Sequence, residues 1–432
     1  MSWVAEAGEG RGVPMTRVGR GGGPEGTLSP QIESGRGHQT DRWLLLVTLL
    51  LLGAGLAMVL SASQIQSIHD HGSAYYYFGH QLLLAAVGLV AMTVLRHLDY
   101  HHLYRWAPLL AGVTAASMAA VLLPHVGLTL GGARRWIDLG PLGTLQPSEA
   151  GKLAFALFIA QWADRRQGRL RSFSDGFVPF AIMTAAILGL LMLQRDLGTA
   201  IVMSAILISV YFAGGGRKGH VLLLLVLLVA AFAILVSLET YRAQRIDAFL
   251  NPFKDPLGTT YQPVQALIGL GSGGIFGVGL GHSVQKYLWL PEAHTDFIFA
   301  IIGEETGLVG TTLVLGGFVL LAVRGYRAAM RAPDRFGVML ATGITTWIGF
   351  QALINMGVVT STLPATGVPL PFISYGGTTL AISLTAMGVL LSVAAAPEKA
   401  TTRRRVDAIA DLGRRNWRPL VAGPRRRTSV PR

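Results

Sequence analysis

The sequence has 432 residues, of which 51% are hydrophobic and only 14% are charged, and it contains no cysteine. Soluble globular domains carry about 25% charged residues, so the composition favours a membrane protein, and the missing cysteine excludes disulfides, thiol catalysis and thiolate metal sites. The formal net charge of +13 fits attraction of basic segments to anionic lipid better than nucleic-acid binding, because the charge gathers in the tails and in short connections.

Apolar blocks recur between residues 43 and 396. Because a bilayer core needs about 20 apolar residues in helical form, these blocks predict an all-α polytopic membrane protein with about ten transmembrane helices. The expected spans are 43–62, 78–95, 107–123, 149–163, 178–194, 197–213, 220–238, 297–322, 337–361 and 374–396. They leave 1–42 as a flexible N-terminal tail, 239–296 as a large loop between helices 7 and 8, and 397–432 as a basic C-terminal tail.

Most of the 36 Lys and Arg residues fall in the two tails and in the even-numbered connections, including "DRRQGRLR" at 164–171 and "RRRV" at 403–406. Cytoplasmic connections carry the excess of Lys and Arg, so both termini are predicted to be cytoplasmic. The extracytoplasmic side then holds the 124–148 loop, "QRDLGT" at 194–199, the 239–296 loop and "TLPATGVPLPFISYGG" at 362–377. Any chemistry is expected on that side.

The stretch "LPEAHTDFIFAIIGEETG" at 290–307 places Asp296 at the expected start of a span. A carboxylate there either caps the helix that follows or has a functional role, because charge at a membrane segment requires solvent, a partner or a function. Glu292 and His294 add two titratable groups beside it. Glu304 and Glu305 lie deeper and cannot share one helix face. We expect one of them to face a cavity and the other to pair elsewhere, unless both are purely structural.

Two charged groups flank the fourth span. Glu149 and Lys152 stand three residues apart, which puts them on one helix face, and a structural ion pair and a functional intramembrane pair are equally supported. Just before them, Arg134, Arg135 and Trp136 form an interfacial set suited to a lipid headgroup phosphate.

Two glycine-containing turns complete the set of candidate motifs. In "QRDLGT", Asp196 is either an N-cap or part of a site in which Gln194 and Arg195 offer donors to an anionic ligand. The stretch "GLGSGGIFGVGLG" at 269–281 contains a nominal Gly-x-Gly-x-x-Gly. Because no strand–helix unit surrounds it, it indicates a turn or close helix packing and not a dinucleotide site.

The motifs "RRWIDLG", "QPSEAGK", "QRDLGTA", "LPEAHTDFIFAIIGEETGLVG" and "INMGVVTSTLPATGVPLPFISYGG" resemble those of the shape, elongation, division and sporulation (SEDS) family of bacterial peptidoglycan polymerases. The resemblance covers about residues 40–398. The segment "GVGLGHSVQKYLWLPEAHTDF" is more similar to the division and sporulation members than to the elongation member. The chain departs from the family where Arg195 replaces the proline of many members, and where "TSTLPATG" at 360–367 replaces the commoner "TGLLPVTG".

The resemblance implies glycosyl transfer on lipid II during cell division, which extends β-1,4-linked glycan strands and releases undecaprenyl pyrophosphate. It implies a bacterial cytoplasmic (inner) membrane with the active face extracytoplasmic. Its expected partners are a class B penicillin-binding protein and other divisome membrane proteins. It assigns Asp296 as the catalytic base for the acceptor hydroxyl. A lipid II flippase, an elongation-type polymerase and a non-catalytic scaffold are the alternatives.

The remaining predictions concern ligands of the site. We expect substrate binding by residues of these motifs, namely Arg134, Arg135, Glu149, Lys152, Arg195, Asp196, Lys286, Glu292, His294 and Ser374. A divalent cation, magnesium or manganese, is left open, because carboxylates are suitable hard oxygen ligands but no ligand set in the sequence identifies a metal. No organic cofactor is expected.

Overall fold

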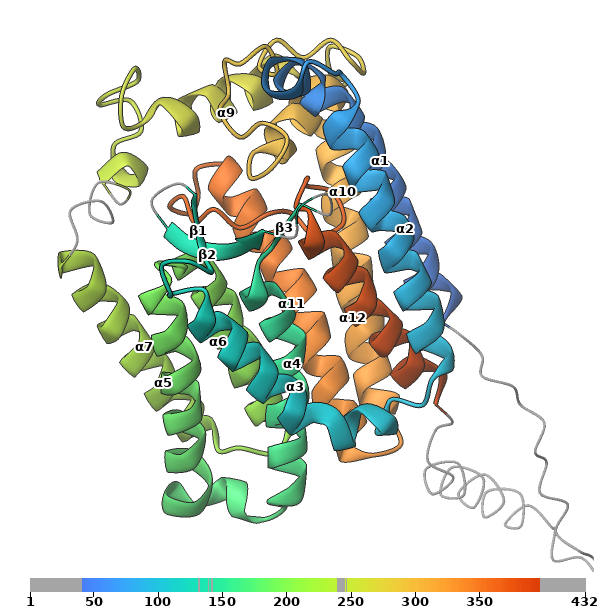
Figure 1. Cartoon of the computed structure of the whole chain (residues 1–432), viewed down its shortest axis with the longest axis vertical. Coiled ribbons are helices and arrows are strands. Elements are labelled where there is room, and N and C mark those ends of the chain that lie inside the picture. Colours follow the sequence, from blue (N-terminus) through green and yellow to red (C-terminus); the bar gives the residue numbers. More distant parts are fainter. Residues whose placement is uncertain are drawn as a thin grey trace, which may run out of the picture. The chain divides into compact units, whose positions relative to one another are not determined.

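The computed structural model of the chain describes residues 41–130, 133–138, 140, 143–238, 245 and 247–396, so the two predicted tails lie almost wholly outside the described residues. Within these ranges a helix lies at each of the ten predicted spans (Figure 1). The helices are α1 Arg42–His71, α2 Tyr76–His97, α3 His101–Ala120, α4 Pro147–Arg165, α5 Val178–Leu193, α6 Leu197–Ala213, α7 Lys218–Leu238, α10 Ile298–Arg331, α11 Arg335–Val359 and α12 Thr378–Ala395.

Among the described residues, six helices are long and apolar enough to cross a membrane: α1, α2, α10, α11, α12 and the segment Phe173–Leu193 that contains α5. The segments Leu197–Ala213 and Lys218–Ile234 are shorter apolar helices. Helix α4 is more polar, because Glu149, Lys152 and Arg165 lie within it. The helical membrane fold is confirmed, and the count of ten crossings stays a prediction.

Small residues bring α2 and α12 into close contact. A side-chain carbon at Gly88 would lie 2.7 Å from Leu384 Cδ1, and one at Gly388 would lie 2.7 Å from Met92 O. Membrane helices associate through such close approaches, because lipid offers them little hydrophobic driving force. The contact holds α12, and the loop that precedes it, against the N-terminal helices.

A small antiparallel sheet fills the connection between α3 and α4, where the sequence predicted only a loop. Its strands are β1 Leu128–Leu130, β2 Ala133–Asp138 and β3 Thr144–Leu145, in the order β1-β2-β3. Thr129 lies opposite Arg134, and Ile137 lies opposite Leu145. Because β3 ends directly before Gln146, the N-cap of α4, the sheet places the basic residues of β2 next to the start of that helix.

The predicted large loop contains a helix, α9 Tyr261–Ser272, while its residues 239–244 and 246 lie outside the described part of the chain. After the loop, α10 runs further than the predicted span and bends at Gly307, where φ is 67°. A side-chain carbon at Gly307 would lie 2.4 Å from both Ile275 O and Gly277 N. Glycine is therefore required there for the loop to pack against the helix.

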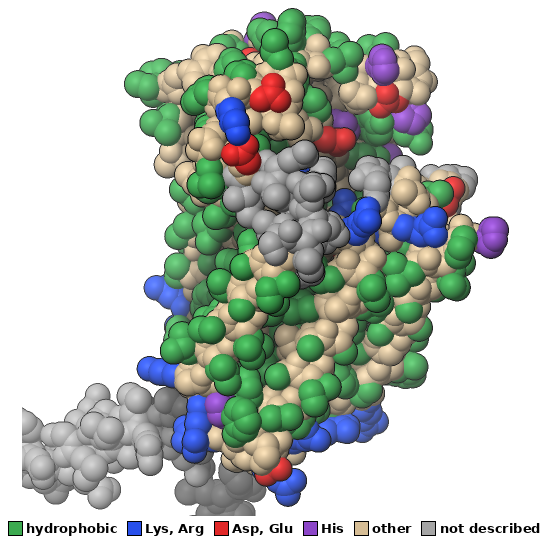
Figure 2. Space-filling model, turned by 90° about the vertical axis from the view of Figure 1, so that its left-hand side faces the viewer, with side chains coloured by type: hydrophobic (Ala, Val, Ile, Leu, Met, Phe, Trp, Pro, Cys, Tyr) green, Lys and Arg blue, Asp and Glu red, His purple; other side chains and the backbone are tan. Residues whose placement is uncertain are grey.

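Charge is unevenly distributed on the face drawn in Figure 2. Hydrophobic side chains cover its middle, Lys and Arg gather at the lower end, and most acidic and histidine side chains lie at the upper end. In Figure 1 the α4–α5 and α10–α11 connections lie at the lower end, whereas the small sheet and α9 lie at the upper end.

Candidate active site

Asp296 lies in the turn before α10 and caps no helix. The N-cap of α10 is Phe297, and no side chain hydrogen-bonds to the free amides of its first turn. The interpretation of Asp296 as a helix cap is therefore wrong. Its side chain is partly buried, yet its carboxylate forms no hydrogen bond with any residue in the described ranges. A partly buried carboxylate that neither caps a helix nor bonds to a described residue is a candidate for a functional role.

The surroundings of Asp296 disfavour its charged form. Burial raises the pKa of Asp296 from 3.8 to about 6, and the nearby Glu292 acts in the same direction. Arg135 and Arg245 oppose this rise, and Asp196 adds a small further increase. The carboxylate thus lies among opposing charges, with a pKa close to the pH at which a general base is most effective.

One amide side chain joins the backbone at Asp296 to the loop after α11. Asn355 Nδ2, on α11, donates to Asp296 O and to Val368 O, both at 2.8 Å. Gly367 lies in the same loop as Val368 with φ 70°, and a side-chain carbon there would be 3.5 Å from Asp296 Oδ2. The loop after α11 therefore forms one wall beside the carboxylate.

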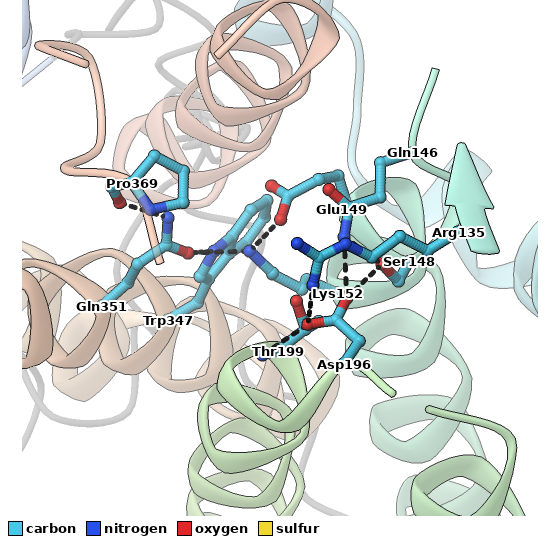
Figure 3. A network of polar contacts seen from close by, with 10 residues as sticks. All are labelled: Arg135, Gln146, Ser148, Glu149, Lys152, Asp196, Thr199, Trp347, Gln351 and Pro369. Atoms are coloured by element: carbon cyan, nitrogen blue, oxygen red, sulfur yellow. Dashed lines mark hydrogen bonds and ion pairs between the residues drawn. The ribbon is translucent and has the colours of Figure 1, made fainter. Parts of the chain in front are cut away.

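Asp196 has several hydrogen-bond and ion-pair partners (Figure 3), whereas the Asp296 carboxylate has none among the described residues. It is the N-cap of α6 and accepts from Thr199 N at 3.2 Å, which confirms the N-cap interpretation. It also accepts from Gln146 Nε2 at 2.7 Å and Ser148 Oγ at 3.2 Å, and Arg135 Nη1 lies 3.4 Å from Oδ1. Asp196 therefore anchors Arg135, whose charge in turn acts on the catalytic candidate.

Glu149 and Lys152 form a buried network that reaches the same loop (Figure 3). Lys152 Nζ donates to Glu149 Oε1 at 2.6 Å and to Gln351 Oε1 at 2.8 Å, and Trp347 Nε1 donates to the same oxygen at 2.8 Å. Gln351 Nε2 then donates to Pro369 O at 2.9 Å. The pair thus connects α4 to α11 and positions the loop beside Asp296. Within the described residues, Glu149 Oε2 is buried without a partner.

Lys286 is not brought to this cluster. It pairs with Glu305 Oε1 at 3.5 Å, and Ser61 Oγ donates to the same oxygen at 2.6 Å. Glu304 accepts from Ser283 Oγ and from two backbone amides 2.9 and 3.3 Å away. Both acids therefore bind the loop at 283–286, so the structural alternative is confirmed and the expectation that one of them faces a cavity is wrong.

Two other predicted binding residues fasten the loops around Asp296. The buried His294 ring lies 4.9 Å from the ring of Tyr77 and 5.5 Å from that of Tyr375, and burial lowers its pKa. Tyr375 N donates to His294 O at 2.9 Å. Ser374 Oγ donates to Thr295 O at 2.6 Å. These contacts position the segment before α10 against α2 and the start of α12.

Three predicted residues lie at the margin of the site. Arg134 donates to Thr129 Oγ1 at 3.3 Å, which holds it on the sheet. Arg195 is exposed and its backbone has φ 58°. Proline cannot adopt this conformation, so the turn before Asp196 has a geometry that proline at this position would not allow. Glu292 is exposed and accepts from Thr295 Oγ1 at 2.7 Å.

The sequence reasoning missed four residues that build this site: Arg245, Gln146, Gln351 and Asn355. Arg245 was counted only as one of the basic residues of the outer face. The other three are uncharged amides within or at the edge of apolar blocks, and a polar side chain in a membrane segment is itself a signal of function or of a specific partner. Gln146 and Asn355 lie within motifs noted above, and Gln351 lies three residues before one of them.

The helices, their apolar surfaces and the charged cluster at one end define a polytopic helical membrane protein. Comparison with known sequences then gives the family, since a sequence model described as "Cell cycle protein", of the FtsW, RodA and SpoVE group, matches residues 42–399. The chain belongs to this family.

Individual proteins similar to this chain belong to the same family. The chain is 43% identical to stage V sporulation protein E of Bacillus subtilis, over 82% of this chain and 96% of that protein. It is 41% identical to the probable peptidoglycan glycosyltransferase FtsW of Geobacter metallireducens, over 82% and 94%. Among solved structures it resembles a chain described under "Structural coordination of polymerization and crosslinking by a peptidoglycan synthase complex" (TM-score 0.68, 29% identity, 82% and 97% covered). It also resembles RodA of Thermus thermophilus (TM-score 0.61, 29% identity, 82% and 96% covered).

Proposed function

We propose that the protein is a peptidoglycan glycosyltransferase that polymerises lipid II during cell division. The observation that carries the proposal is the Asp296 carboxylate, which forms no hydrogen bond to the described residues and has its pKa raised to about 6 by burial and by Glu292, against the opposing charges of Arg135 and Arg245. A scaffold would have no use for such a group, because a carboxylate whose pKa is raised by folding destabilises the folded state at neutral pH. Relatives at about 40% identity are named as peptidoglycan glycosyltransferases.

The geometry suits transfer from a lipid-linked pyrophosphate. Asp296 accepts the proton of the acceptor hydroxyl as its oxygen bonds to the anomeric carbon of the donor sugar, while the bond from that carbon to the pyrophosphate oxygen breaks. Such a base contributes on the order of 10²- to 10⁴-fold to the rate. Arg135 and Arg245 lie where positive charge stabilises the departing pyrophosphate by charge-assisted hydrogen bonds. Arg135 is kept in place by Asp196.

The proposed location is the bacterial cytoplasmic membrane, with both termini cytoplasmic and Asp296 on the extracytoplasmic side. The gathering of Lys and Arg at the end opposite the small sheet and α9 supports this orientation (Figures 1 and 2), because basic residues are retained on the cytoplasmic side. Lipid II presents its sugars on the outer surface once it has been translocated, which is the side of the proposed base.

A flippase for the same lipid is less well supported. Such a protein needs polar groups along a path through the bilayer, whereas the buried lysines of the described residues are paired with carboxylates. Lys152 is bound to Glu149 and Gln351, and Lys286 is bound to Glu305. An elongation-type role is also less well supported, because the solved RodA is 29% identical and the sporulation and division relatives are about 40% identical.

A partner and a cation complete the proposal. We expect a class B penicillin-binding protein to crosslink the product, in line with the structural likeness to a chain of a peptidoglycan synthase complex, together with other divisome membrane proteins. A magnesium or manganese ion stays a prediction. In the described part of the chain no three His, Asp or Glu side chains converge as metal ligands, and no step above depends on a metal ion.

The decisive experiment is polymerisation of fluorescently labelled lipid II by the purified protein with its crosslinking partner, resolved on a gel. We expect Asp296→Ala and Asp296→Asn to abolish polymer while partner binding persists. Asp247→Asn is the matched control, since Asp247 is an exposed carboxylate paired with Lys254 at 2.9 Å. Full polymer yield from Asp296→Ala refutes the assignment of the base. Translocation of lipid II in vesicles without any polymer supports the flippase instead.

A further inference from the structure

A cavity of about 200 Å³ lies between the end of α11, the start of α9 and the short segment around residue 248. It is lined mainly by Arg245, Phe249, Gln262, Ser361, Leu363 and Ala365. Water occupies about 30 Å³ per molecule in the liquid, so the cavity has room for roughly six waters or a single sugar ring. Neither Asp196 nor the Glu149–Lys152 pair lines it, so it is distinct from the polar network described above.

The cavity adjoins the catalytic carboxylate. Arg245 lines it, donates to Ala365 O at 3.0 Å, and acts electrostatically on Asp296. Ala365 also lines the cavity, two residues before Gly367, which borders Asp296 Oδ2. The loop at 365–367 therefore has the cavity on one side and the proposed base on the other.

Ser361 has two properties that its place in the fold does not account for. Its Oγ is buried and has no hydrogen-bond partner in the described part of the chain. Its backbone has φ 51°, a left-handed conformation in which a non-glycine residue is strained, and such strain is common where ligands are held. Glycine is the usual residue where a helix ends in this conformation. The serine therefore costs stability twice, and a hydrogen bond from its hydroxyl to a ligand offsets the first of these costs.

The rest of the lining suits a sugar. Phe249, Leu363 and Pro263 give an apolar wall for the face of a ring, while Gln262, Thr259 and Ser361 give donors and acceptors for the groups on its rim. Pockets of this kind fix a ligand with a few polar groups set in an apolar lining.

We propose that this cavity is a subsite for one N-acetylated sugar ring, with Ser361 bonding a ring substituent and Ala365 providing the space. The inference rests on the proposed function for the identity of the sugar, and makes Ser361 a specificity-determining residue of the reaction. The ring belongs either to lipid II or to the growing glycan, which carry the same chemistry.

Ser361→Gly is the informative substitution, because it removes the hydroxyl and relieves the strained backbone, so misfolding does not explain a loss of function. Ala365→Val fills the cavity without removing a polar group. Thr360→Ala is the matched control, since the Thr360 hydroxyl donates back to Met356 O at 2.9 Å. Steady-state polymerisation is measured twice, with lipid II varied at saturating glycan primer and with primer varied at saturating lipid II.

We expect Ser361→Gly to raise one of the two KM values about tenfold, the effect of one lost hydrogen bond to a ligand. Ala365→Val is expected to raise the same KM because the larger side chain fills the cavity, and kcat stays nearly unchanged in both variants. The substrate whose KM rises identifies the source of the ring. KM values within twofold of wild type for both substrates overturn the inference, even if Asp296→Ala abolishes polymer.

A second measurement separates this inference from the proposed function. Soluble N-acetylglucosaminyl-N-acetylmuramic disaccharide is expected to raise the Tm of the wild type and of Thr360→Ala, but not that of Ser361→Gly. If that pattern holds while no polymer forms, the subsite stands and the polymerase proposal fails. If the disaccharide raises the Tm of the wild type and of Ser361→Gly equally, the subsite is refuted.

Discussion

Replacing Asp296 with asparagine should stabilise the protein at neutral pH. The carboxylate has its pKa raised from 3.8 to about 6 by burial and by Glu292, so the folded state holds the proton more tightly than the unfolded state. Stability therefore falls as pH rises from about 4 to about 6, and the loss is complete above that range. At about 1.4 kcal/mol per pKa unit, the charged carboxylate costs roughly 3 kcal/mol at pH 7. Asparagine has nearly the same shape and no charge, so it removes this cost.

Asp196→Asn is the matched comparison and should act in the opposite direction. Asp196 accepts from Gln146, Ser148 and Thr199 and pairs with Arg135. Losing its charge weakens all four contacts and leaves the guanidinium uncompensated, at a cost of about 2–4 kcal/mol.

Thermal unfolding in detergent, followed by tryptophan fluorescence at pH 7 and near pH 4, measures both effects. We expect the Asp296→Asn variant to have the higher Tm at pH 7 and to lose that advantage near pH 4, while the Asp196→Asn variant has the lower Tm at pH 7. An Asp296→Asn variant that is less stable than wild type at pH 7, or whose advantage does not change with pH, refutes the claim that the carboxylate is held in an unfavourable environment.

Three further outcomes are expected. The polymerisation rate should rise with pH through about 6, because Asp296 must be ionised to act as a base. Glu292→Gln should move that midpoint to lower pH, and an unchanged midpoint in initial rates contradicts the assigned electrostatics. Gly367→Ala should lower the polymerisation rate roughly ten- to a hundredfold in the gel assay. The left-handed backbone at this position should lower the free energy of unfolding of the variant by only about 1–2 kcal/mol. A variant with the wild-type rate contradicts close contact between residue 367 and the Asp296 carboxylate. Lys152→Met should destabilise the protein by about 3–5 kcal/mol by leaving Glu149 buried alone, and adding Glu149→Gln should restore most of the lost Tm.

The positions of the ten helices could be predicted because each helix corresponds to one contiguous apolar segment of the sequence, and such a segment can be recognised without knowing its neighbours in the fold. The three-stranded sheet could not, since strands of two to six residues carry no period long enough to detect, and the pairing of Ile137 with Leu145 is a tertiary event. The kink of α10 is also tertiary, because Gly307 is needed only where residues 275–277 approach it.

The sequence allowed the charged residues of the site to be identified, but not the residues with which each of them pairs. Asp296, Arg135 and Asp196 were selected as charges at membrane edges, and the structure brings their charges together. Lys286 was selected on the same grounds, but it forms an ion pair with Glu305 and does not reach this cluster. Spacing along the chain cannot identify partners that come from another segment, and it does not distinguish the capping role of Asp196 from the free carboxylate of Asp296.

Asn355 has a mechanical consequence for the whole site. Its one amide nitrogen donates to the peptide carbonyls of both Asp296 and Val368, each at 2.8 Å, so one side chain of α11 joins the segment before α10 to the loop after α11. Membrane helices tilt to match the thickness of the bilayer around them. Because the two edges of the candidate site share this donor, we expect them to move together when α11 tilts.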